Sequence, residues 1–203
     1  MAKQELINHI QSRLKEILQK PVVISGTNPL SGGCINESFQ LLSNVGSFFL
    51  KWNSATAYPN MFNDEAKGLR LLKKASAIGI PEVIEEGEYN GLSYLLLEFI
   101  EPGKEIKNYY ELFGASLAQL HKCSANEFGL PYDNYIGSLK QYNAQTKNGV
   151  EFFIEQRLKK QITLAQKNGL RPLQTKRKFD SLFKHLPDVL PNEKPALLHG
   201  DLW

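Results

Sequence analysis

The sequence predicts an α+β protein in which a small antiparallel sheet precedes a set of helices. In the first hundred residues, short β-branched and aromatic runs alternate with turn residues, which is typical of strands in close succession. Beyond Pro102 the apolar residues recur at helical spacing instead. This order predicts a sheet lobe over residues 1–101 and a helical lobe over residues 102–203.

Within the first lobe the expected helix 1–20 is followed by short strands and one further helix. A glycine-rich turn from Gly26 to Gly33 separates the first two strands, and Asn90-Gly91 predicts a tight hairpin because both residues tolerate positive φ. The expected strands are 21–24, 38–42, 47–52, 81–89 and 92–100, and a helix is expected at 61–75. In the second lobe helices are expected at 109–122, 150–167 and 173–186.

The composition is that of an ordinary globular protein, with 42% hydrophobic and 22% charged residues among 203. A net charge of +3 argues against nucleic-acid binding, because the basic residues are spread along the chain apart from the short run Lys176-Arg177-Lys178, which is expected to be a solvated helix face. The first twenty residues form an amphipathic pattern without the apolar centre of a signal peptide, and the sequence has no apolar run of membrane-spanning length. Cys34 and Cys123 do not suggest a disulfide framework or a zinc site, so the cytoplasm is the expected compartment.

The segment Ser31-Gly32-Gly33-Cys34-Ile35-Asn36 lies in a turn between two expected strands. Glycines allow backbone N–H groups to approach phosphates, so Gly32, Gly33, Cys34, Ile35 and Asn36 are candidate ATP-binding residues. The segment does not fit the loop of P-loop ATPases because no Gly-Lys-Ser/Thr follows. An ordinary turn is the alternative.

A lysine at the end of an expected strand, Lys51, is followed by Glu65 on the next helix. In protein kinases such a lysine contacts the α- and β-phosphates of ATP and is held by the helix glutamate. We therefore expect Lys51 and Glu65 to be an ATP-binding pair, with two solvated charges as the alternative.

The apolar run 95–97 opens into Glu98, Phe99 and Ile100, as a kinase hinge does when it offers backbone groups to adenine. These three residues are therefore predicted ATP-binding residues, and a buried strand with a turn fits equally well. An apolar strand ending in His199-Gly200-Asp201 resembles the kinase catalytic loop, whose aspartate accepts the substrate hydroxyl proton. Asp201 is the predicted catalytic base.

Several stretches resemble the fructosamine (ketosamine-3) kinase family. They are Gly32-Gly33-Cys34-Ile35-Asn36-Glu37, Phe49-Leu50-Lys51-Trp52-Asn53, Leu97-Glu98-Phe99, Gln141-Tyr142-Asn143, Phe152-Phe153-Ile154-Glu155-Gln156-Arg157-Leu158 and Leu198-His199-Gly200-Asp201-Leu202-Trp203. The resemblance implies a protein-kinase-like fold with two lobes. It also implies transfer of the ATP γ-phosphate, with Mg²⁺, to the sugar 3-hydroxyl of ribulosamine or fructosamine on protein lysines. The product decomposes and frees the amine, which makes the activity a deglycation repair.

On this resemblance Gln141, Asn143 and His199 are substrate-side candidates. The sequence departs from the family at Asn148-Gly149, where a tryptophan usually stands. The asparagine that holds magnesium is expected about five residues after Asp201. No metal ligand is therefore assigned within residues 1–203, and these 203 residues alone are expected to be inactive.

Cys34 is a candidate redox-sensitive thiol because neighbouring backbone N–H groups lower a thiol pKa, and it could link two chains through a disulfide. A small packing residue is the alternative at this position. For the whole chain, an aminoglycoside or choline kinase of the same fold and a catalytically dead nucleotide-binding module are the competing hypotheses.

Overall fold

The computed structural model describes residues 2–31, 35–104, 106–170 and 173–200, and it contains two compact units. The first unit covers residues 1–110 and holds a sheet with two helices, and the second covers residues 111–203 and is mainly helical. The predicted α+β class, with strands first and helices second, is confirmed. The unit boundary falls in the first turn of the helix α3 (Tyr109–His121), whereas the sequence suggested 101/102.

The first unit is built on one antiparallel sheet with the strand order β1-β2-β3-β5-β4. Its strands are β1 (Ile24–Leu30), β2 (Glu37–Ser43), β3 (Gly46–Ser54), β4 (Val83–Tyr89) and β5 (Leu92–Glu98). Two-residue turns join β2 to β3 and β4 to β5, and the helix α2 (Met61–Ala75) separates β3 from β4. β3 thereby becomes the central strand, paired with β2 on one side and with β5 on the other.

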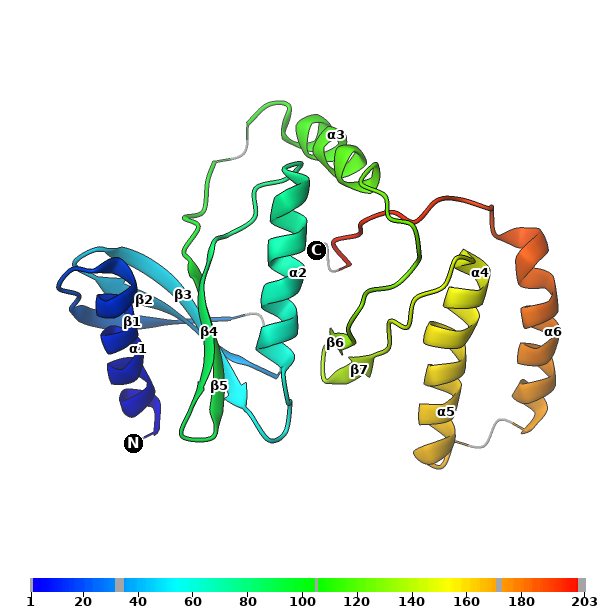
Figure 1. Cartoon of the computed structure of the whole chain (residues 1–203), viewed down its shortest axis with the longest axis horizontal. Coiled ribbons are helices and arrows are strands. Elements are labelled where there is room, and N and C mark those ends of the chain that lie inside the picture. Colours follow the sequence, from blue (N-terminus) through cyan, green and yellow to red (C-terminus); the bar gives the residue numbers. More distant parts are fainter. Residues whose placement is uncertain (1, 32–34, 105, 171–172, 201–203) are drawn as a thin grey trace. The chain divides into compact units, whose positions relative to one another are not determined.

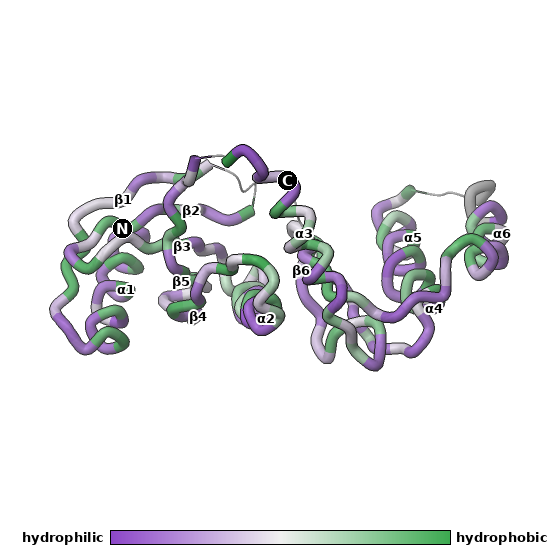
Figure 2. The backbone as a smooth tube through the Cα atoms, turned by 90° about the horizontal axis from the view of Figure 1, so that it is seen from above, coloured by the Kyte–Doolittle hydropathy of each residue, from purple (hydrophilic) through white to green (hydrophobic). Residues whose placement is uncertain are grey.

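The helices α1 (Ala2–Leu18) and α2 cover opposite faces of this sheet (Figure 1). Hydrophobic and hydrophilic residues alternate along α1 with the helical turn (Figure 2), so one side of the helix can be buried. Leu6, Ile10 and Leu14 form this buried side and are fully inaccessible. They pack on the other residues of the main core, which are Val22 before β1 and the sheet residues Phe39, Leu41, Phe48, Leu50, Trp52, Tyr94 and Leu96.

β1 begins three residues later than the expected strand 21–24, and it continues through Gly26 and Pro29 as far as Leu30. The expectation that the glycine-rich turn begins at Gly26 is wrong. β1 is an edge strand, and a proline is tolerated there because an edge strand has no partner on one side for the N–H that proline lacks. Gly26 lies at a register irregularity, which the strand accommodates without breaking.

The hairpin predicted at Asn90-Gly91 is confirmed. Both residues have positive φ, 48° and 78°, which is the conformation of the two-residue turn that matches the twist of paired strands. The turn joins β4 to β5 and so fixes their register from Tyr89 opposite Leu92 onwards.

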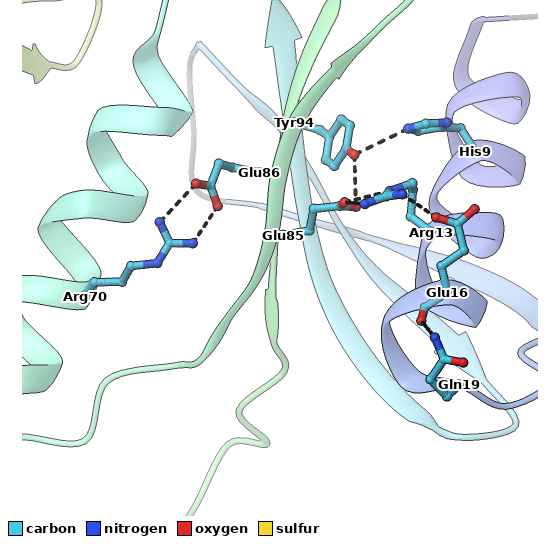
Figure 3. A network of polar contacts seen from close by, with 8 residues as sticks. All are labelled: His9, Arg13, Glu16, Gln19, Arg70, Glu85, Glu86 and Tyr94. Atoms are coloured by element: carbon cyan, nitrogen blue, oxygen red, sulfur yellow. Dashed lines mark hydrogen bonds and ion pairs between the residues drawn. The ribbon is translucent and has the colours of Figure 1, made fainter.

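Successive glutamates on β4 bind the two helices from opposite faces of the sheet (Figure 3). Glu85 accepts a hydrogen bond from Arg13 of α1 at 2.7 Å and another from the Tyr94 hydroxyl at 3.0 Å. Glu86 accepts two bonds from the guanidinium of Arg70 on α2, at 3.0 and 2.8 Å. Burial, together with the charge of Glu85, raises the pKa of the Tyr94 phenol well above its usual range.

The second unit contains, after α3, the small hairpin β6 (Asn134–Ile136) and β7 (Leu139–Gln141), which the sequence did not predict. The remaining elements are α4 (Gly149–Phe152), the π-helix η1 (Phe153–Leu158), α5 (Lys159–Lys167) and α6 (Leu173–Val189). α4, η1 and α5 follow one another without a break, so the expected helix 150–167 is present but carries a π-helical segment in its middle.

Residues 191–199 have no regular secondary structure, so the strand expected just before His199 is wrong. A strand needs a neighbour for its backbone groups. In the described part of the chain, the one backbone bond found for this stretch to another element is from Leu197 N–H to the Cys123 carbonyl, at 2.9 Å, beyond the end of α3. None of the helices described is both long and apolar enough to cross a bilayer.

We predict that α1 stabilises the sheet through its buried side. Leu14→Ala should lower the free energy of unfolding by about 2–5 kcal/mol because it leaves a cavity between helix and sheet. The control Lys15→Ala, on the exposed side of the same helix, should change it by less than about 0.5 kcal/mol. Urea unfolding followed by circular dichroism measures both, and equal effects would contradict this packing.

Candidate functional site

The structure brings together the two residues expected to pair, Lys51 on β3 and Glu65 on α2. The Lys51 ammonium forms an ion pair with Glu65 Oε1. The side chains are 16% and 33% exposed, so solvent screens the pair only in part. Nζ of Lys51 also lies 5.6 Å from the ring centroid of the buried Phe62, where the ring face attracts a cation.

The placement of Glu65 follows from the pattern of α2. Met61, Phe62 and Ala66 are buried against the sheet, and Glu65 lies three to four residues beyond the first two, on the same side of the helix. Lys51 extends from the sheet face opposite the α1 core, because side chains alternate along β3 and Leu50 faces α1. The carboxylate therefore lies at the edge of the buried helix face, where it can meet the ammonium.

A buried polar cluster lies on the same sheet face, two residues beyond Lys51. Asn53 is 6% exposed and donates to Asn36 Oδ1 at 2.9 Å and to the Met61 sulfur at 3.0 Å. Ser93 of β5 donates to Asn53 Oδ1 at 3.1 Å. Sequence reasoning missed Asn53 and Ser93, although the alternation along β3 would have placed Asn53 on the same side as Lys51.

The residues expected at the hinge, Glu98, Phe99 and Ile100, follow the buried stretch of β5. The Glu98 N–H donates to the Glu82 carbonyl at 2.9 Å, and a Glu98 carboxylate oxygen accepts from the Glu82 N–H at 3.1 Å. Glu98 is thus bound to the loop before β4, while Ile100 is 59% exposed.

In the second unit, Asn143 is 2% exposed and makes polar contacts in several directions. Its amide nitrogen donates to Asn134 Oδ1 at 2.8 Å and to the Tyr132 carbonyl at 3.2 Å. Its amide oxygen accepts from Arg157 at 2.8 Å. Gln141, half-buried at the end of β7, donates to the same Asn134 oxygen at 3.2 Å. These amides are bound within the protein, so they hold the hairpin β6–β7 in place.

Arg157 of η1 is the cation in this cluster. Its guanidinium also donates to the Tyr142 carbonyl and lies 4.7 Å from the Phe152 ring centroid. Partial burial lowers the pKa of Arg157, because it disfavours the charged form. Gly129 completes the packing with φ +97°, and a Cβ there would lie 2.5 Å from the Asn143 carbonyl oxygen.

His199 is half-buried, and Gly200 has a left-handed φ of +85°. The predicted residues Gly32, Gly33, Cys34 and Asp201 lie outside the described residues. In the described ranges, His, Cys, Asp and Glu side chains do not gather into groups of three or more that could hold a metal ion.

A lysine on the third strand of a five-stranded antiparallel sheet, ion-paired with a glutamate on the next helix, is the arrangement of the sheet lobe in a protein-kinase-like fold. The model of the fructosamine kinase family matches residues 6–203. The chain therefore belongs to the fructosamine kinase family.

Three relatives illustrate the similarity. A protein of Synechocystis named a probable ketoamine kinase is 35% identical over 198 residues, which are 96% of this chain and 65% of the relative. The chloroplastic protein-ribulosamine 3-kinase of Arabidopsis thaliana is 35% identical over 189 residues, or 91% and 57% of the two chains. A crystal structure assigned to a fructosamine-3-kinase of Haemophilus somnus has a TM-score of 0.82 at 30% identity, covering 96% and 65%. The chain thus spans less than two thirds of the length of these three relatives.

We predict that Asn143 stabilises the second unit. Asn143→Ala should lower the free energy of unfolding by about 1–3 kcal/mol, because it removes hydrogen bonds from the half-buried Asn134 and Arg157. Gln141→Ala, which removes one bond to the same Asn134, should cost less than about 1 kcal/mol. Thermal unfolding of the two variants measures the difference, and a larger loss for Gln141→Ala would refute the central position of Asn143.

Proposed function

We propose that the protein transfers the γ-phosphate of ATP to the sugar 3-hydroxyl of ketosamines, such as ribulosamine or fructosamine on protein lysines. The observation that carries this proposal is the Lys51–Glu65 ion pair in a chain of the fructosamine kinase family. The relatives named ketoamine kinase and protein-ribulosamine 3-kinase support this class of substrate.

In this mechanism Lys51 binds the α- and β-phosphates of ATP. A lysine side chain is flexible, and Glu65 restricts its ammonium to one position before the nucleotide arrives. Preorganised charge is the main contribution that a protein makes to phosphoryl transfer, because the transferring group needs positioning and charge neutralisation more than covalent help.

Other predicted residues complete the nucleotide site. The segment from Gly32 to Asn36 covers the phosphates, and the backbone at Glu98, Phe99 and Ile100 meets adenine. Mg²⁺ enters as the counter-ion of ATP, and no ligand is assigned to it within residues 1–203.

Asp201 accepts the proton of the sugar 3-hydroxyl while the hydroxyl oxygen forms its bond to the γ-phosphorus. The bond from that phosphorus to the bridging oxygen of ADP breaks in the same displacement. The product is a ketosamine 3-phosphate, whose decomposition frees the lysine amine. Gln141, Asn143 and His199 remain the predicted residues on the substrate side. Asn143 and Gln141 both donate to Asn134 of β6, so Asn143 helps to hold the hairpin that carries Gln141.

Cys34 is the predicted redox site. Its thiol lies in the predicted phosphate-covering segment, so an intermolecular disulfide through Cys34 would disturb ATP binding. Comparison of chain mass on gels with and without reductant, for the native protein and for Cys34→Ser, distinguishes this linkage from one through Cys123.

The activity is tested by incubating the intact protein with Mg-ATP and ribulosyl-lysine and following phosphate transfer. We expect a 3-phosphorylated product that is abolished by Asp201→Asn. If ATP binds but neither ribulosyl-lysine nor fructosyl-lysine is phosphorylated, the substrate is another hydroxylated small molecule.

The Lys51–Glu65 pair gives a further prediction for the same assay. Lys51→Met and Glu65→Gln should each lower kcat/KM for ATP by about 100-fold, because each removes the fixed charge at the phosphates. The matched control is Arg70→Gln, which breaks the exposed ion pair between α2 and Glu86 and should leave kcat/KM within about two-fold. A loss of similar size in Arg70→Gln would show that the position of α2, and not the Lys51 charge, determines the rate.

A further inference from the structure

The side-chain amide of Asn53 continues the pairing of β2 with β3 past the end of its backbone ladder. The last backbone pair of this ladder is Glu37 with Trp52. Asn36, just before β2, and Asn53 of β3 occupy the next position, and there the contact is the 2.9 Å hydrogen bond between their side chains. Asn36 is the final residue of the segment proposed to cover the ATP phosphates, so this bond ties the end of that segment to β3.

The Asn53 amide is held from other directions as well. Its nitrogen has two hydrogens, and the second contact of that nitrogen is with the Met61 sulfur at 3.0 Å. Its oxygen accepts from Ser93, which lies directly opposite it on β5. Asn53, Ser93 and Met61 are each 5–6% exposed, so water does not compete strongly for these bonds.

These contacts connect the elements on either side of Lys51. Met61 is the first residue of α2 and lies one helical turn before Glu65, on the same side of the helix. Asn53 therefore touches the start of the helix that carries Glu65 and also the end of the segment that contains Asn36. Lys51 contacts the same helix from two residues earlier on β3.

We propose that Asn53 is a positioning residue of the ATP site, which sets Asn36 and the first turn of α2 in register with Lys51. It acts through Asn36 and Met61 and does not itself contact the nucleotide. The inference rests on the proposed kinase function. A buried asparagine with a purely structural role would stabilise the fold without a selective effect on ATP.

A double-mutant cycle on the intact protein tests the proposal, with the variants Asn36→Ala, Asn53→Ala and the combination. Asn53→Ala should raise KM for ATP by about five-fold, the effect of one lost hydrogen bond, and leave KM for ribulosyl-lysine within about two-fold. Because Asn36 is one of the two residues through which Asn53 acts, the double variant should raise KM for ATP by less than the two single effects multiplied together. Additive effects on ATP, or equal changes of KM for both substrates, would overturn the proposal.

A second measurement does not depend on catalysis. Amide hydrogen exchange at residues 35–40 should be about five-fold faster in Asn53→Ser, which removes the amide nitrogen that bonds Asn36. The control Asn28→Ala removes an exposed amide contact to Gln40 in the same β1–β2 hairpin and should leave KM for ATP unchanged. Unchanged exchange in Asn53→Ser would refute the positioning role, and faster exchange in a protein that does not bind ATP would refute the kinase function alone.

Discussion

The alternation of side chains along β3 is the constraint on which the rest of the first unit depends. Leu50 and Trp52 face α1 and complete the hydrophobic core, while Lys51 and Asn53 face α2 and carry the polar contacts. A shift of register by one residue would bury the ammonium in the core and expose the leucine. The buried side of α1 therefore fixes the orientation of the charged site on the opposite face.

β4 applies the same constraint at the edge of the sheet. Because Glu85 and Glu86 are consecutive, they point to opposite faces and bind Arg13 of α1 and Arg70 of α2. The bonds at Glu85 also engage the buried Tyr94, so an ionic contact is joined to the core. Both helices are thus attached to one strand, each on its own face of the sheet.

Much of this organisation could be predicted from the sequence. The Asn90-Gly91 turn and the pairing of Lys51 with Glu65 have local or strongly patterned signals, and the structure contains both. β1 was mispredicted because glycine and proline usually end strands, whereas pairing along an edge strand tolerates them. Asn53 was missed because its partners are distant in the sequence, and burial of an amide is decided by tertiary contacts.

The π-helix η1 adds a constraint of length to the second unit. It holds six residues with i→i+5 hydrogen bonds, between the α-helical turns of α4 and α5. Losing one residue would let the segment relax into continuous α-helix, because a π-helical turn holds one residue more than the α-helical turn that it replaces. The helix α5 would keep its orientation, but the side chains within the segment would change direction. Arg157 would then turn away from Asn143. The extra residue of η1 therefore determines the direction of Arg157, and with it the contact to Asn143, without changing the course of the helix.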